Sequence, residues 1–232
     1  MKKSILIFAI LLLPSCKANR KPGGTIVKPV GTTNYYEPFE ILNGRVKQVK
    51  EMFEDVTSGK PEIVITNFDK EGNAIQTHES VLGGDSNTTV YNYKYDKDGV
   101  RTEVAMMSAE LGDDIYQCDE YGRIARKSTR TDMVKNNSME PLQEKSFYKY
   151  DEAGNMIEAD LYLETELRFS EKYKYNNKHL LLEKDAFSRA EKFADTTTYQ
   201  YQSFDKNGNW TKRARLIKDN EPFTVTRYIT YY

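Results

Sequence analysis

A short turn-forming unit that recurs along the chain constrains its fold more than any other feature. The unit is an aromatic residue or Cys, then Asp, two variable residues and Gly, as in the YDEAG of residues 150–154. Six copies begin 27, 23, 32, 25 and 29 residues apart. The fifth copy is degenerate, with Asn176 in place of Asp and His179 in place of Gly. Recurrence at this period indicates a repeat architecture.

Each copy predicts the tip of a hairpin. The Asp side chain accepts hydrogen bonds from backbone amides ahead of it, and Gly takes the positive φ that other residues find costly. A type I turn followed by a left-handed residue is a common short hairpin connection. Because His179 replaces Gly, we expect the fifth turn to differ. The structural turn residues are Asp69 and Gly72, Asp96 and Gly99, Asp119 and Gly122, Asp151 and Gly154, and Asp205 and Gly208.

The residues beside the turns alternate between aromatic and polar. Tyr91, Tyr93 and Tyr95 are separated by Asn92 and Lys94, for example. Alternation of β-forming residues with period two predicts strands with one buried face. Adding first and last strands near 44–53 and 223–231 gives about fourteen strands. The sequence therefore predicts an all-β fold, an antiparallel up-and-down meander of hairpin repeats.

A meander of this length must cover two edges and one apolar face. Closing into a barrel removes the edges, so we predict a soluble, closed barrel, with a curled open sheet or a flattened sandwich as alternatives. A lipid-facing barrel needs uniformly apolar outward positions, and charged residues interrupt strands at 46–51 and 211–215. The final aromatic, Tyr232, is by contrast typical of outer-membrane barrels.

The N-terminal segment differs in composition from the rest. Lys2 and Lys3 precede an apolar run, residues 5–13, which at about ten residues is too short to cross a bilayer of roughly 30 Å as a helix. This layout predicts a signal peptide at 1–15. Residues 16–43 are rich in Pro, Gly, Thr, Asn and Lys, without an apolar period, which predicts a flexible tether. The β-meander domain would then be 44–232.

Leu13-Pro14-Ser15-Cys16 resembles the bacterial lipoprotein signal, although Pro14 is a less usual occupant. The resemblance implies cleavage before Cys16, lipidation of Cys16 and tethering to the inner or outer membrane. No acidic cluster follows Cys16, so we expect the periplasmic side rather than the cell surface. The alternative is an ordinary signal peptide with an unrelated Cys, which also predicts export.

The turn units resemble the YD repeats of Rhs-type proteins, in which Tyr-Asp-x-x-Gly-Asn or Tyr-Asp-x-x-Gly-Arg recurs along an extended β-sheet. The ending, 209–213 followed by 226–232, is similar to the close of many uncharacterised secreted bacterial proteins, some described as having a porin-like barrel fold. These resemblances cover roughly residues 44–232. They imply architecture and almost nothing about activity.

Candidate chemistry is sparse. With two His residues and one Cys besides Cys16, the chain lacks the parts of a usual nucleophile–His site or Cys/His zinc site. Cys118 alone cannot form an internal disulfide. Loss of the leader removes Lys2 and Lys3 and leaves 32 basic against 35 acidic residues. These charges are interspersed rather than gathered in a basic stripe, which excludes nucleic acid as a partner. We expect no catalytic residue, metal or cofactor.

The functional expectation is a monomeric binding or scaffold module of the bacterial envelope, not an enzyme, with a glycan or an envelope protein as partner. The aromatic content of 12% suits a core of rings, or alternatively a cavity for sugars. Competing functions are a purely structural envelope protein and a glycan hydrolase with paired carboxylates. No binding residue is assigned. We expect any binding face at the end opposite the turns, where the longest connections are 132–143 and 186–195, the latter with a short helix near 187–193.

Overall fold

The computed structural model describes residues 25–27, 40–54, 61–81, 86–108, 112–135, 138–189, 193–217 and 222–232. Within these ranges the chain forms strands and no helix, so no helix there has the length and apolarity to cross a membrane. Strands β3 to β16 form one closed antiparallel barrel of fourteen strands, and β1 and β2 form a separate two-stranded sheet. The predicted all-β barrel is confirmed, and the open sheet and the sandwich are wrong. The predicted signal peptide and Cys16 lie outside the described residues.

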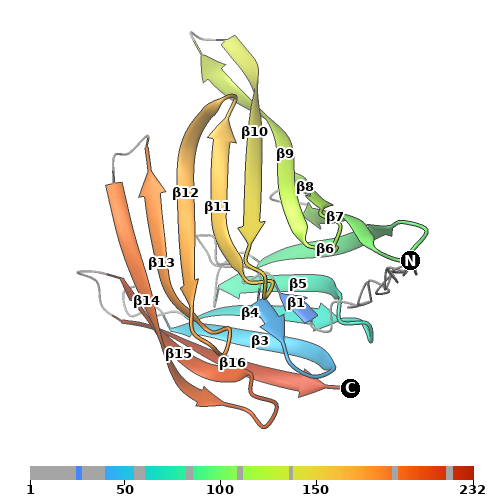
Figure 1. The fold of residues 1–232 in the computed structure, drawn as a ribbon, viewed down its shortest axis with the longest axis vertical. Coiled ribbons are helices and arrows are strands. Elements are labelled where there is room, and N and C mark those ends of the chain that lie inside the picture. Colours follow the sequence, from blue (N-terminus) through green and yellow to red (C-terminus); the bar gives the residue numbers. More distant parts are fainter. Residues whose placement is uncertain are drawn as a thin grey trace, which may run out of the picture.

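The first nine strands are β1 Thr25–Val27, β2 Glu40–Leu42, β3 Val46–Glu54, β4 Glu62–Phe68, β5 Ala74–Val81, β6 Ser86–Tyr95, β7 Arg101–Ser108, β8 Gly112–Cys118 and β9 Ile124–Lys135. The remaining bounds are β10 Ser138–Tyr150, β11 Met156–Leu163, β12 Glu166–Tyr175, β13 Leu181–Ser188, β14 Phe193–Phe204, β15 Trp210–Ile217 and β16 Phe223–Tyr231. Figure 1 shows that the hairpin of β9 and β10 extends beyond its neighbours.

Each barrel strand pairs with its neighbours in sequence, and β16 pairs with β3 to close the barrel. In this seam Val225 lies opposite Phe53. Beyond the last strand, the backbone N–H of Tyr232 donates to the carbonyl of Arg45 over 3.0 Å. Figure 1 shows β3 and β16 side by side although they lie at opposite ends of the chain.

Alternation along the strands separates the two faces of the barrel wall. In β4, Glu62, Val64, Thr66 and Phe68 are buried and the residues between them are less so. The side chains of a strand point to opposite faces in turn. In β4 every second residue, beginning with Glu62, therefore points into the barrel. These inward residues are polar as well as apolar.

The Asp-x-x-Gly sequences form tight turns. In the turn after β6, the backbone N–H groups of Asp98 and Val100 donate to Asp96 Oδ1, both over 2.9 Å. The N–H of Gly99 donates to the Asp96 carbonyl over 3.1 Å, and Gly99 has a φ of 77°. The strand register shifts by one residue beside the turn, between Lys94 and Tyr95. A left-handed Gly beside a bulge is the usual way to join twisted strands in a short hairpin.

The residue after the Gly extends this turn. Asn155 donates its side-chain N–H to Asp151 Oδ2 over 2.7 Å, and Asn73 does the same to Asp69 over 2.8 Å. In the third turn the guanidinium of Arg123 holds Asp119 at 2.7 Å. Both oxygens of each Asp are thus engaged locally, which gives a physical reason for Asn or Arg after the Gly.

The fifth turn does not differ as expected. The N–H of His179 donates to the Asn176 carbonyl over 3.0 Å, and Leu180 N–H donates to Asn176 Oδ1 over 3.1 Å. These are the hydrogen bonds of the Gly-containing turns. His179 adopts the left-handed conformation itself, with a φ of 61°. The hydrogen-bond pattern therefore determines the turn geometry even where the residue type disfavours it.

All six of these turns lie at one end of the barrel, here called the turn end, because they follow β4, β6, β8, β10, β12 and β14 in an antiparallel meander. At the opposite end, two predicted loops are wrong. Strands β9 and β10 continue to Lys135 and from Ser138, so most of 132–143 is strand. The expected helix near 187–193 is also wrong at its ends, since Phe187 belongs to β13 and Phe193 to β14; residues 190–192 lie outside the described part.

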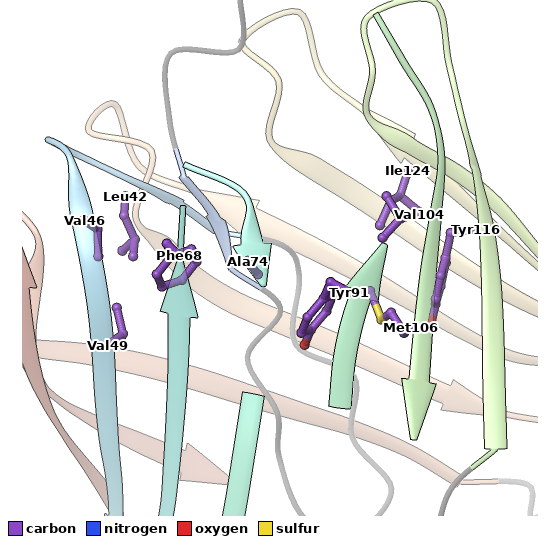
Figure 2. Close-up of a cluster of buried hydrophobic side chains, with 10 residues drawn as sticks. All are labelled: Leu42, Val46, Val49, Phe68, Ala74, Tyr91, Val104, Met106, Tyr116 and Ile124. Carbon is purple, nitrogen blue, oxygen red and sulfur yellow. The ribbon is translucent and has the colours of Figure 1, made fainter. Parts of the chain in front are cut away.

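One side of the barrel interior is lined by β3–β9 and buries an apolar cluster, here called the apolar side (Figure 2). Leu42, from β2, packs into it beside the barrel wall. The partly buried thiol of Cys118 also packs against this cluster. The buried members are Leu42, Val46, Val49, Phe68, Ala74, Tyr91, Val104, Met106, Tyr116 and Ile124.

The side lined by β10–β16 buries charged groups and is here called the ionic side. Lys184 Nζ lies 3.0 Å from Glu171 Oε1, and both side chains have no exposed surface. The hydroxyl of Tyr173 donates to the other Glu171 oxygen over 2.5 Å. Arg213 and Arg227 are buried on the same side. Arg213 falls within 211–215, which the sequence analysis counted as outward charge, so for this residue that interpretation is wrong.

Outward charges come from other positions. Lys94 pairs across two strands with Glu103 at 2.7 Å, and Lys149 with Glu158 and Lys174 with Glu183 form equivalent pairs. The three lysines are well exposed. These pairs place charge on the outer face near the turn end, beside exposed apolar residues such as Ile75 and Leu182.

Candidate binding pocket at the turn end

A pocket of about 180 Å³ opens at the turn end of the ionic side. Its walls come from the turns at 151–155, 176–180 and 205–209 and from β2. The pocket therefore combines residues from three repeats with a segment that lies more than a hundred positions earlier in the chain. Sites of drug-sized ligands usually measure about 300–1,000 Å³. This smaller volume suits a ligand with a single ring.

Asn209 fixes the N-terminal segment against the barrel. Its side chain accepts from the N–H of Asn43 over 2.7 Å and donates to the Asn43 carbonyl over 2.9 Å. The same amide donates to the hydroxyl of Tyr231 over 2.8 Å, and that hydroxyl donates to Asp205. This position follows the Gly of the last turn. Asn209 therefore belongs to the last turn and also binds the backbone of Asn43, the residue that follows β2.

Glu40 on β2 reaches the ionic side. One carboxylate oxygen accepts from Nε1 of Trp210, and the other accepts from Nη2 of Arg227 over 2.9 Å. Arg227 also donates to Glu51 on β3 over 2.8 Å. Residues 40–43 lie in the range that the sequence analysis assigned to a tether. In the structure Leu42 and Glu40 contribute to the interior, while the rest of that domain division stays a prediction.

Two guanidinium groups pack on the indole of Trp210. Arg227 Cζ lies 3.5 Å from the ring centroid and Arg213 Cζ lies 4.3 Å from it. Burial alone lowers the pKa of Arg227, but the carboxylates of Glu40 and Glu51 outweigh burial and raise the pKa above its usual value. Arg227 therefore stays charged in the interior. Cation–π contact of this kind strengthens as water is removed.

The rim of the pocket carries polar turn residues. The Nδ2 group of Asn155 lies 3.2 Å from Nδ1 of His179 and 2.7 Å from Asp151 Oδ2. Burial raises the pKa of Asp151, but the hydrogen bonds from Asn155 and the turn amides outweigh it and lower the pKa overall. Lys178 lies beside these residues in the lining. The rim thus offers an ammonium group, an amide and an imidazole within one small opening.

Tyr175 forms part of the wall without offering its hydroxyl. The hydroxyl donates to the carbonyl of Met156 over 2.8 Å. Burial, and then the nearby charge of Glu40, raise the pKa of this phenol. Tyr175 therefore stays neutral and contributes ring surface.

The residues named from the sequence fall into separate places. The turn Asp carboxylates accept backbone and side-chain N–H groups, and Asp151 and Gly154 lie beside the pocket. Cys118 lies at the end of β8, where burial raises the pKa of its thiol to about 11. Across the ranges that the structure describes, no three His, Cys, Asp or Glu side chains are grouped to hold a metal ion. The connections expected to carry a binding face lie largely outside the described residues, so that expectation stays a prediction.

Sequence reasoning missed Glu40, Asn209, Arg213 and Arg227. Glu40 is separated from Trp210 by 170 positions, and nothing in the chain links the two. Arg227 does carry a signal, because it alternates with the apolar residues Val225 and Ile229 and so has inward parity. An arginine at an inward position indicates a buried partner of opposite charge.

These features define the class of the protein: a closed fourteen-stranded antiparallel β-barrel whose turn end holds a small polar pocket. No protein-family model matches the sequence, and a search of curated proteins finds no match.

Solved structures with similar architecture include two porin-like proteins. That of Bacteroides uniformis is 11% identical, with 82% of this chain and 99% of that chain covered at a TM-score of 0.49. That of Bacteroides vulgatus is 12% identical, with 81% and 98% covered at a TM-score of 0.42. The Tc holotoxin pore of Photorhabdus luminescens is 10% identical, with 84% of this chain but 12% of that chain covered at a TM-score of 0.33. These similarities say nothing about activity.

Proposed function

We propose that the protein is an exported, lipid-anchored β-repeat barrel that serves as a binding module of the bacterial envelope, with the turn-end pocket as its site and a small glycan as its ligand. The observation that carries the proposal is the pocket of about 180 Å³, which brings Asn155, Lys178, His179 and Arg213 together. Small-ligand sites combine ring or apolar surface with a few convergent polar groups. Tyr175 and Leu180 supply such surface here.

Anchoring rests on the N-terminal sequence. Met1 to Ser15 has the layout of a signal peptide, and the Leu13-Pro14-Ser15-Cys16 stretch resembles a lipoprotein signal. Lipidated Cys16 would place the barrel at the periplasmic side of the inner or outer membrane. The YD-like repeats supply the barrel wall in this proposal.

Binding is favoured over catalysis by the chemistry of the pocket. Glycosidases use two carboxylates that flank the scissile bond. Among the described residues of the lining, Glu40 is the one carboxylate, and both its oxygens hold Trp210 and Arg227. A glycan hydrolase is therefore the weaker alternative.

A purely structural envelope role is the second candidate. The observation in its favour is the fully buried pair of Glu171 and Lys184, which fills interior space on the ionic side without facing a ligand. A structural role predicts that no small ligand stabilises the fold.

A thermal-shift screen tests the binding proposal. The chain from Lys17 onward is screened against glycans and peptidoglycan fragments, and a ligand raises Tm with dose if it binds the native state. Lys178→Ala should reduce the shift, whereas Lys97→Ala should not, because Lys97 occupies an equally exposed turn outside the pocket. A flat panel would reject the binding role and leave the structural one.

Metabolic labelling tests the anchor separately. Cells expressing the full chain are fed an alkyne-bearing fatty acid, and the protein should take up label. Cys16→Ser should abolish the label. Equal labelling of both forms would contradict lipidation at Cys16.

A further inference from the structure

Residues 40–43 are held at the turn end by individual contacts rather than by a sheet. In the part of the chain that the structure describes, β2 pairs along its backbone with β1, and these two strands stand apart from the barrel sheet. A two-stranded hairpin is at best marginally stable in water. The position of β2 therefore depends on the contacts that residues 40–43 make with the barrel.

Two side chains of this segment are recognised separately. The carboxylate of Glu40 accepts hydrogen bonds from Nε1 of Trp210 and, over 2.9 Å, from Nη2 of Arg227. Leu42 is 1% exposed and lies in the apolar cluster (Figure 2). Because side chains two positions apart in a strand point to the same face, one extended segment reaches both places. The barrel thus provides a polar and an apolar subsite at the spacing Glu-x-Leu.

The third contact involves the backbone. The side chain of Asn209 accepts from the N–H of Asn43 over 2.7 Å and donates to the carbonyl of Asn43 over 2.9 Å. The amide group therefore pairs with one residue of the segment as a neighbouring strand would, whatever side chain that residue carries. Backbone hydrogen bonds for affinity, combined with side-chain pockets for specificity, are the usual way in which proteins bind extended peptides.

The charged groups of the barrel remain paired without the segment. Arg227 also donates to Glu51 from Nη2 over 2.8 Å and from Nε over 3.2 Å. Glu51 and Arg227 are both buried, whereas the side chain of Glu40 is 23% exposed. Departure of Glu40 therefore leaves the guanidinium with a carboxylate partner and avoids the cost of an unpaired buried charge.

Unfilled space borders the segment. The turn-end pocket of about 180 Å³ includes Glu40, Leu42 and Asn43 in its lining. An incoming chain can therefore make its first contacts in this pocket, beside β2, before residues 40–43 leave. The occupied site and the open pocket together form one continuous surface at the turn end.

From these observations we propose that the turn end is a docking site for an extended peptide of a partner protein, one that carries a Glu and, two residues later, a Leu. In the structure the chain's own residues 40–43 fill this site. A tethered segment competes at a high effective concentration, so the partner gains access when the segment is weakened or withdrawn. The inference goes beyond the proposed function, because it concerns the place that β2 fills and a different class of ligand.

Fluorescence polarisation with a labelled peptide of residues 38–45 tests the proposal on the lipid-free mature chain. Glu40→Gln removes the charge of the competing segment and leaves Trp210, Arg227 and Asn209 in place. This variant should bind the peptide about tenfold or more tightly than the parent chain does. Glu120→Gln, in an exposed turn outside the pocket, should bind the peptide as weakly as the parent does.

Two further changes locate the site. A peptide with Gln in place of its Glu should bind the Glu40→Gln chain about tenfold more weakly than the unchanged peptide does. Adding Trp210→Phe to Glu40→Gln removes the indole N–H but keeps an aromatic ring beside Arg227, and should also weaken binding by about tenfold. Circular dichroism checks the fold of this double variant because Trp210 is buried; the two peptides test the site without it.

Three outcomes would overturn the inference. They are no binding to the Glu40→Gln chain, equal binding to that chain and the parent, and equal binding of the two peptides. The glycan screen is a separate measurement. If glycans raise Tm and the peptide does not bind, the inference fails and the proposed function stands. If the peptide binds and glycans do not, the proposed glycan ligand fails and the docking site stands.

Discussion

The apolar side and the ionic side of the barrel interior are built on the same strand alternation, and the ionic side adds a fully buried ion pair to its own apolar cluster. On the apolar side, Val104 and Met106 pack against Tyr116 and their neighbours. On the ionic side, Lys184 and Glu171 are fully buried and lie 3.0 Å apart. Apolar burial is roughly proportional to area and tolerates the loss of one neighbour. A buried charge costs several kcal/mol unless its partner is present. Substitutions in the apolar cluster should therefore lower the free energy of unfolding in proportion to the area removed. Loss of one member of the buried ion pair should lower it by more than its area predicts.

The largest expected effect is the loss of one buried charge. Lys184→Met keeps the volume of the side chain but removes the cation that lies 3.0 Å from buried Glu171, and should lower the free energy of unfolding by about 3–5 kcal/mol. Lys174→Met removes the exposed pair with Glu183 and should cost far less, because solvent screens an exposed ion pair. Urea denaturation measures both.

A double variant sharpens this test. Adding Glu171→Gln to Lys184→Met removes the buried negative charge and keeps an acceptor for the hydroxyl of Tyr173. Most of the lost stability should return. If Lys184→Met alone costs no more than Lys174→Met, the two sides of the interior do not differ in the way described.

The apolar cluster around Cys118 should disfavour a negative charge on its thiol. Burial is the main reason that the pKa of its thiol rises to about 11, while Arg101 lowers it in part and Asp119 raises it. The thiolate is the reactive form, so folding should slow labelling at pH 8 roughly a hundredfold relative to the urea-unfolded chain. The rate should increase as pH rises toward 11. The measurement uses Cys16→Ser protein and a maleimide, and fast labelling at pH 8 would show an open, polar surrounding.

Truncation within the apolar cluster should have a smaller effect than loss of the buried lysine. Val104→Ala removes two methylene equivalents at about 0.8 kcal/mol each and leaves a small cavity, for a total of about 2 kcal/mol. Thermal unfolding in low and high salt should show the same loss, because no charge is involved. A strong salt dependence would indicate that the cluster is coupled to the ion pairs.

The smallest expected effect compares two turns on the ionic side. His179→Gly relieves a left-handed residue and should stabilise the fold by about 0.5–1 kcal/mol, after allowing for the greater freedom of Gly in the unfolded chain. Gly154→Ala should destabilise by about 1–2 kcal/mol. An added Cβ at Gly154 meets nothing within 4 Å, so that cost is conformational alone. Equal stability of His179→Gly and the parent would show that the contact with Asn155 offsets the strain.

The sequence was sufficient for the barrel wall because its signals are local. Tyr91 and Tyr93 alternate within one strand, and Asp96 and Gly99 form one turn, so neither needs information from elsewhere in the chain. Closure followed from the need to cover edges. The contents of the interior were not predictable in this way, because the charged partners of Lys184 and Arg227 lie on other strands and no local pattern identifies them.

The pocket was beyond sequence reasoning for the same reason. Its wall includes Glu40 and Asn43, which come from a segment with no strand period, held by the side chain of Asn209. The lengths of the connections at 132–143 and 186–195 instead favoured a binding face at the end opposite the turns. In the sequence, the residues of these three turns look like ordinary turn residues. The pocket becomes apparent only when the three turns are seen beside β2 in the structure.

The pairing of β16 with β3 should be a late event in folding. The two strands are joined by more than 160 residues, so their contact has a far greater sequence separation than any hairpin pairing. Such contacts form slowly, because the chain loses the entropy of a long loop before the pairing stabilises it. The repeats can form one after another as local hairpins, yet the barrel remains open, with two unpaired edges, until β16 pairs with β3. Strand β16, Phe223–Tyr231, therefore closes the barrel. Without this strand, the exposed edge of β3 could pair with a second chain.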